Sequence, residues 1–155
     1  MKTLLTKKRI KTMTYLLLPI IAGLAITLQS TLSGKSTKEF GSMETVIMIH
    51  LFGLLAALII YFSRGDFSLS FFSKVNLLPI IAGSLGVVII FSISNSVIMN
   101  GVTTTLVITI VLQLIVGKVI DHFGMFGVER SPINLYQVVG IVVVFIGVFI
   151  FQKAK

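Results

Sequence analysis

Residues Gln113 to Pro132 have the sequence QLIVGKVIDHFGMFGVERSP. The stretch begins as an apolar segment and ends in a short loop that contains both charges and glycines. Long apolar segments that are almost free of charge are typical of membrane spans. The loop closes with Ser131, a good N-cap residue, followed by Pro132, which suits the first position of a helix. The stretch therefore predicts a membrane helix, a compact turn and the start of a further helix.

The composition extends this interpretation to the whole chain. Of its 155 residues, 55% are hydrophobic and only 12% are charged, whereas a soluble domain carries about 25% charged residues. The formal net charge is +8, but the basic residues flank apolar segments and do not alternate with aromatic residues on one face, so we expect no nucleic acid partner. The chain has no cysteine, which excludes a disulfide framework and thiolate metal sites. We expect an all-α, polytopic integral membrane protein in contact with the lipid bilayer.

Five apolar segments are long enough to cross a bilayer as helices. We expect a single membrane domain over residues 1–155, with spans at approximately 13–32, 43–62, 75–93, 102–120 and 132–151. The basic N-terminus and the first apolar segment resemble a signal peptide. However, the segment is long enough to span and offers no clean cleavage site, so we expect a retained helix.

The segment between the first two spans contains glycine, serine and charged residues. It predicts a polar turn over residues 32–42. Ser42 would cap the second helix, and Glu44 in its first turn would suit the helix dipole.

Basic residues are distributed unequally between the two sides of the predicted spans. Nine would lie on the side of the N-terminus: Lys2, Lys7, Lys8, Arg9, Lys11, Arg64, Lys74, Lys118 and Arg130. Four would lie on the other side: Lys35, Lys38, Lys153 and Lys155. Because cytoplasmic segments carry the excess of Lys and Arg, we expect a cytoplasmic N-terminus, an external C-terminus and one fixed orientation.

The sequence LLPIIAG occurs twice, at Leu17–Gly23 and at Leu77–Gly83. Two equivalent helix pairs would explain the repeat, and so would chance in a composition rich in Leu and Ile. In either case we expect each proline in the first turn of a helix, where it costs no hydrogen bond. The Ala-Gly pair that follows would let another helix approach closely.

Catalytic chemistry is not indicated. An enzyme needs a nucleophile with a base, paired carboxylates or a metal cluster. The chain has two histidines, and its five acidic residues lie near predicted helix ends or in loops. No glycine-rich phosphate loop follows a strand pattern. We expect no catalytic residue, no cofactor and no metal site.

Polar residues inside the predicted spans carry the functional signal. On the fourth span they recur with small residues every four positions, which keeps neighbours on one slowly drifting face: Thr105, Thr109, Gln113, Gly117 and Asp121. Lipid cannot satisfy polar side chains, so they should face other helices or a hydrated cavity. A polar transport path fits this pattern, and so do hydrogen bonds that only hold helices together.

The candidates for a path are Gln29, His50, Asn95, Thr105, Thr109, Gln113, Asp121 and His122. Gln29 and Gln113 come first, because glutamine is bulkier and costlier to bury than serine or threonine. His50 is a lone histidine in a span, and an interhelical hydrogen bond is its competing role. Asp121 and His122 would shape a cytoplasmic mouth. The candidates for close helix contact are Gly23, Gly83, Gly117, Gly140 and Gly147.

The fourth span and its loop also carry a family resemblance. They resemble the short YdcZ-type membrane proteins, which are inner-membrane exporters of the drug/metabolite transporter superfamily. The residues that carry it are Gln113-Leu114, Gly117, Asp121-His122-Phe123-Gly124, Phe126-Gly127 and Pro132. The first span is similar too, with small residues leading to Gln29 and then Leu32-Ser33-Gly34, although the family has asparagine where this chain has Ser33.

The resemblance implies a chain of about five helices that forms half of a ten-helix transporter unit. Two such halves would face each other across a central site and move a small molecule across the bacterial inner membrane by alternating access. The partner would be a second copy or a paralogue. The fixed orientation favours a paralogue or a parallel partner, and an antiparallel homodimer stays open. The alternative function is a structural or regulatory membrane protein that binds partner helices without transport.

Overall fold

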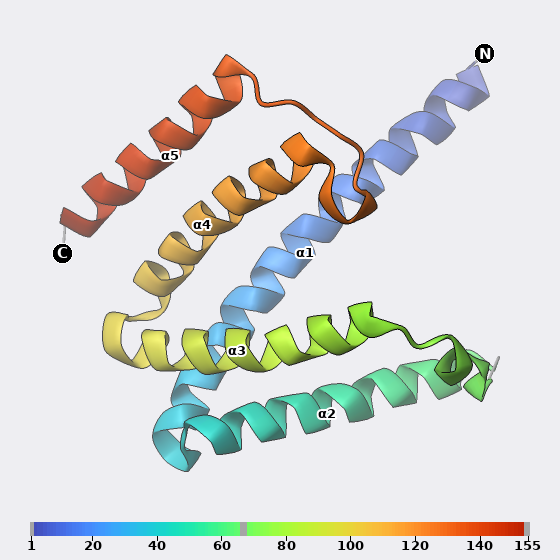
Figure 1. Ribbon diagram of the computed structural model, residues 1–155, viewed down its shortest axis with the longest axis vertical. Helices are drawn as coiled ribbons and strands as arrows, with labels where there is room; N and C mark the ends of the chain where they lie inside the picture. The colour runs from blue at the N-terminus through green and yellow to red at the C-terminus, as the bar shows by residue number, and fades with distance from the viewer. Residues whose placement is uncertain (1, 66–67, 154–155) are drawn as a thin grey trace. The chain divides into compact units, whose positions relative to one another are not determined.

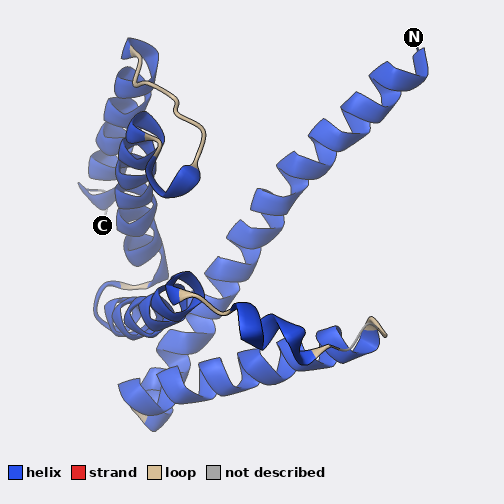
Figure 2. Ribbon diagram, turned by 45° about the vertical axis from the view of Figure 1, so that its right-hand side comes forward, coloured by secondary structure: helices blue, strands red, loops and turns tan. Residues whose placement is uncertain are grey.

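The computed structural model describes residues 2–65 and 68–153, and every regular element in them is helical (Figures 1 and 2). The long helices are α1 (Lys2–Phe40), α2 (Ser42–Ser63), α3 (Leu77–Asn100), α4 (Val102–Phe123) and α5 (Leu135–Lys153). Two short 3₁₀ helices, η1 (Leu69–Lys74) and η2 (Met125–Gly127), lie in the loops. Among the described residues, 5 helices are long and apolar enough to cross a membrane. The predicted all-α class with five spans is therefore confirmed.

The chain divides into two compact units. The first runs to Met99 and contains α1, α2 and α3, and the second begins at Asn100 and contains α4 and α5. That the five helices form a single membrane domain stays a prediction.

In the first unit, α2 and α3 run antiparallel. The Ser42 hydroxyl at the start of α2 donates a hydrogen bond to Asn95 Oδ1 near the end of α3, at 2.8 Å. Eight residues further along α2, His50 Nε2 lies 3.1 Å from the position that a Cβ at Gly86 would occupy. The second contact lies later on α2 but earlier on α3, as expected for two antiparallel helices.

The buried positions of this unit are mostly small and polar: Ser30, Ser33, Thr37, Thr45 and Ser94. Small residues at helix contacts are typical of membrane proteins, because they let backbones approach closely. The serine hydroxyls donate to carbonyl oxygens four residues back in their own helices. From Leu17 on, most of the described large apolar side chains of the three helices are exposed, as expected where lipid is the surrounding solvent.

The end of α1 differs from the prediction. The helix continues to Phe40, so the polar turn predicted over residues 32–42 is wrong, and the break is reduced to Gly41 with φ 103°. Ser33 and Thr37 are buried in this last part of α1, and such tertiary packing outweighs the weak helix propensity of serine, threonine and glycine. Ser42 is also not the N-cap of α2, since Gly41 holds that position. Glu44 does lie in the first turn of α2, as predicted.

The two copies of the LLPIIAG repeat occupy different places in their helices. Pro79 lies in the first turn of α3, as predicted. Pro19 lies inside α1, because this helix begins at Lys2. The prediction of a first-turn position is therefore wrong for Pro19, which has no N–H and removes one hydrogen bond from the helix interior.

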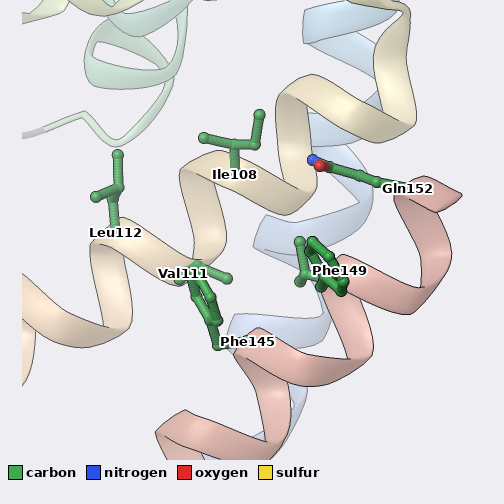
Figure 3. Close-up of a pocket in the computed structure, with 7 residues that line it drawn as sticks. Ile108, Val111, Leu112, Phe145, Phe149 and Gln152 are labelled. Atoms are coloured by element: carbon green, nitrogen blue, oxygen red, sulfur yellow. The ribbon is translucent and has the colours of Figure 1, made fainter.

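In the second unit, α4 and α5 also run antiparallel. Residues in the first half of α4 share a groove with residues in the second half of α5, and Figure 3 shows Val111 of α4 beside Phe145 of α5. The last two turns of α4 share another groove with the first half of α5. The turn between the helices is compact, with Gly124 and Gly127 at φ 64° and 81°, which confirms the predicted turn and the role of its glycines.

The start of α5 differs from the prediction. The helix begins at Leu135, so Ser131 is not its N-cap and Pro132 is not its first residue. Asn134 and Gln137 form a reciprocal capping box in which Gln137 N donates to Asn134 Oδ1 at 2.9 Å and Asn134 N donates to Gln137 Oε1 at 3.2 Å.

Candidate functional site

Both candidate glutamines lie within membrane spans, Gln113 at a midpoint and Gln29 toward an end. Gln113 is halfway along α4. Gln29 lies toward the end of the apolar part of α1, six residues before Lys35. Both side chains are exposed on their helices, and within the described residues neither carboxamide has a hydrogen-bond partner. Transfer of an amide from water to a hydrocarbon that offers no hydrogen bond costs roughly 4–8 kcal/mol. Each glutamine therefore requires a polar partner, water or a ligand within its span.

His50 presents one unpaired nitrogen at the contact of α2 with α3. Its Nδ1 lies 2.8 Å from the carbonyl oxygen of Val46. Because a carbonyl oxygen only accepts hydrogen bonds, Nδ1 carries the hydrogen. Nε2 then lies over Gly86 and has no hydrogen-bond partner among the described residues. The side chain is half-buried. Nε2 is therefore an unpaired hydrogen-bond acceptor within a span.

Asn95 and the threonines of α4 are satisfied inside their own units. Asn95 Oδ1 accepts from Ser42, and Asn95 Nδ2 donates to the carbonyl oxygen of Phe91 at 2.7 Å. The Thr105 and Thr109 hydroxyls each donate to the carbonyl oxygen four residues back, at 2.8 Å. These bonds satisfy the three side chains within a helix or between two packed helices. That the three residues line a path stays a prediction.

His122 lies in the last turn of α4 and helps to hold the loop that follows. Arg130 Nε donates to the His122 carbonyl oxygen at 3.1 Å, and the backbone N–H of Ile133 donates to His122 Nδ1 at 3.1 Å. The loop therefore folds back over the end of α4, and the imidazole is part of the turn.

Asp121 has a different role from its neighbour. Its backbone carbonyl oxygen accepts from Ser131 N at 2.8 Å. Lys118 lies one turn earlier on α4 and donates from Nζ to Ser131 O at 3.0 Å and to Ser131 Oγ at 3.2 Å. No hydrogen bond or ion pair reaches the Asp121 carboxylate from the described part of the chain. The carboxylate therefore remains available to a ligand.

Two grooves lie between α4 and α5. The groove beside Asp121 measures about 460 Å³ and is lined by Leu114, Gly117, Lys118, Asp121, Gln137, Gly140, Ile141 and Val144. The groove at the other end of the helix pair measures about 280 Å³ and is lined by Ile108, Val111, Leu112, Phe145, Val148, Phe149 and Gln152 (Figure 3). Only the first groove contains ionisable side chains.

The glycines predicted at helix contacts all lie in open space within their own units. A Cβ added at any of them would meet no atom within 4 Å: Gly23, Gly83, Gly117, Gly140 and Gly147. Their role in close helix contact stays a prediction. The close approaches occur at Gly34, where a Cβ would collide with Val97, and at Gly86 beside His50.

Sequence reasoning missed Gly34 and Gly86 as contact residues. A signal for Gly34 is present, because Ser30, Ser33, Gly34 and Thr37 have the spacing of one helical face and all are small. A signal for Gly86 is present too, because the small residues Ala82 and Gly83 lie one helical turn before it. In residues 2–65 and 68–153, no three His, Asp or Glu side chains gather as metal ligands would.

Five apolar helices with lipid-facing large side chains and polar groups at mid-span define a multi-pass membrane protein. A family model described as "Putative inner membrane exporter, YdcZ" matches residues 14–150, and the chain belongs to this family. The predicted family and the inner-membrane location are thus confirmed, and the family is one of transporters, not of enzymes. No curated protein and no solved structure matches the chain.

Proposed function

We propose that the chain is one half of a secondary transporter that exports a small molecule by alternating access. Its other half is a second five-helix chain. Within the described residues, no more than 17% of any candidate span is buried. Large helix faces are therefore left uncovered within each unit, and we infer that lipid and other helices cover them.

The observation that carries this proposal is the state of Gln29 and Gln113. Both carboxamides lie within spans, Gln113 at the midpoint of α4, and both are exposed and have no hydrogen-bond partner among the described residues. Serine and threonine hydroxyls can bond to their own helix, as Thr109 does, but these glutamines do not. Since hydrocarbon leaves such groups unsatisfied, a hydrated path with polar solute explains both of them.

The uncovered glycines support a partner chain. Within their own units, Gly23, Gly83, Gly140 and Gly147 each have open space in front of them, and small residues of this kind let a second helix approach closely in a membrane. The excess of basic residues on the side of the N-terminus favours a single orientation with that terminus in the cytoplasm. It therefore favours a paralogue or a parallel copy, while an antiparallel homodimer stays open.

The test compares Gln113→Leu with Gln152→Leu, a matched change at the far end of α5. Cells that express wild type, either variant or an empty vector are grown in one medium, and exported solutes are identified by untargeted mass spectrometry. We expect at least one solute to depend on the wild-type chain. Its export should fall about fivefold or more in Gln113→Leu, because a hydrogen bond to a polar solute contributes of order 1 kcal/mol or more. Gln152→Leu should retain it, and membrane levels of both variants should match wild type.

Two results would count against the proposal. If wild type and empty vector export the same solutes, the chain is not an exporter under these conditions of expression, and the structural or regulatory alternative takes its place. If export depends on the chain but is unchanged in Gln113→Leu and in Gln29→Leu, the path does not pass these glutamines.

A further inference from the structure

The groove beside Asp121 has a polar end and an apolar body. Asp121 and Lys118 come from the last two turns of α4, and Gln137 comes from the first turn of α5. Leu114 and Val144 line the groove further along the two helices, toward the middle of the spans. Polar groups at a span end with apolar walls running inward match the layout of a phospholipid, whose headgroup lies at the interface and whose chains lie in the hydrocarbon.

The charges at the polar end are not paired with each other. Lys118 and Asp121 are three residues apart on α4, a spacing at which opposite charges can meet. Lys118 instead directs Nζ to the oxygen atoms of Ser131, and no cation reaches the Asp121 carboxylate from the described residues. A carboxylate at a membrane interface is stabilised by a cationic donor, so the ligand should bring an ammonium group.

The same end also offers donors for an anion. Lys118 Nζ has three hydrogens and uses two on Ser131. Gln137 uses its Oε1 to accept from Asn134, which leaves its amide N–H groups without a partner among the described residues. One ammonium hydrogen and one amide are therefore available to phosphate oxygens beside the carboxylate.

From this arrangement we propose that the groove between α4 and α5 binds phosphatidylethanolamine. Its primary ammonium group binds Asp121, its phosphate accepts from Lys118 and Gln137, and an acyl chain lies along Leu114 and Val144. The volume of about 460 Å³ lies within the range of small-molecule sites. The glycine positions Gly117 and Gly140 leave the space that the lipid occupies. This site does not depend on the transport proposal, because binding needs neither a gradient nor a partner half.

Two other lipid classes fit the groove less well. Phosphatidylcholine has a quaternary ammonium group without an N–H, so it cannot donate to Asp121. Phosphatidylglycerol is a net anion and would place its charge beside an uncompensated carboxylate, where like charges repel.

The test uses the purified, delipidated full chain in detergent. It is mixed with equal amounts of dioleoyl phosphatidylethanolamine, phosphatidylcholine and phosphatidylglycerol, and bound lipid is counted by native mass spectrometry. We expect phosphatidylethanolamine to be retained about tenfold over phosphatidylcholine, the factor that a charge-assisted hydrogen bond supplies. Asp121→Asn should remove this preference. Glu129→Gln should keep it, because this change removes the same charge from an exposed position of the adjacent loop.

A second pair of variants tests the location. Gly140→Leu fills the groove and should abolish the preference, whereas Gly147→Leu, on the same helix but outside the groove, should keep it. Equal retention of the three lipids by wild type would overturn the proposal without any variant. A preference for phosphatidylglycerol that survives Asp121→Asn would overturn it as well. So would a loss of the preference for phosphatidylethanolamine in Glu129→Gln but not in Asp121→Asn.

Discussion

The contact of α1 with α3 at Gly34 predicts opposite effects for the same substitution at two glycines of α1. A Cβ at Gly34 would lie 3.0 Å from Val97 Cβ, closer still to Val97 Cγ1, and 3.7 Å from the carbonyl oxygen of Ser94. Valine in a helix is held in one χ1 rotamer, so Val97 cannot swing aside, and α1 and α3 must separate instead. A Cβ at Gly23 would meet no atom within 4 Å.

The magnitude follows from two terms. Gly→Ala inside a helix favours the helix by about 1 kcal/mol, and this gain applies at both positions and cancels in their difference. Overpacking at a close contact costs about 1–3 kcal/mol. Gly34→Ala should therefore be less stable than Gly23→Ala by about 1–3 kcal/mol. At about 2–4 °C per kcal/mol for a chain of this size, the difference in Tm is roughly 2–12 °C.

The assay is the Tm of the purified full chain in one detergent, followed by size-exclusion chromatography after heating. Val97→Ala added to Gly34→Ala should restore part of the loss, since it removes the branch that the new methyl group meets, and the double-mutant cycle should show coupling. A Tm of Gly34→Ala equal to or above that of Gly23→Ala would refute the reasoning. So would two strictly additive effects of Gly34→Ala and Val97→Ala.

Two further predictions concern the ends of helices. Asn134→Ala removes the acceptor for Gln137 N and should cost about 0.5–2 kcal/mol of stability, measured as a fall in Tm. Asn134→Asp keeps an acceptor and should retain most of the stability. Equal Tm values for the two variants would contradict the capping box. Because the chain has no cysteine, a cysteine placed at Lys38 or at Glu129 is a unique label. In right-side-out vesicles a membrane-impermeant maleimide should modify the cysteine at position 38 but not the one at position 129, and the reverse pattern would invert the proposed topology.

The candidate site was only partly predictable, as Gln113 and Asp121 illustrate. Their residue types and their spacing on α4 are local information, and so is the expectation that lipid cannot satisfy them. That the Asp121 carboxylate stays unpaired could not be predicted from the sequence, because Lys118 at the right spacing suggests an ion pair. The structure directs this lysine to Ser131, which the loop brings back to α4 through its bond to the Asp121 carbonyl oxygen.

The sequence by itself determined the fold class, the number of spans and the family. Apolar length is a property of consecutive residues, and a bilayer leaves helices as the available form for such segments. Tertiary structure alone decided where α1 ends, which glycines bring helices together and which polar groups are left unpaired. Each of these depends on residues far apart in the chain, as Gly34 against Val97 and Ser42 with Asn95 show. Local propensity predicted a polar turn at residues 32–42, and burial of its small side chains in the first unit made it the last part of a helix instead.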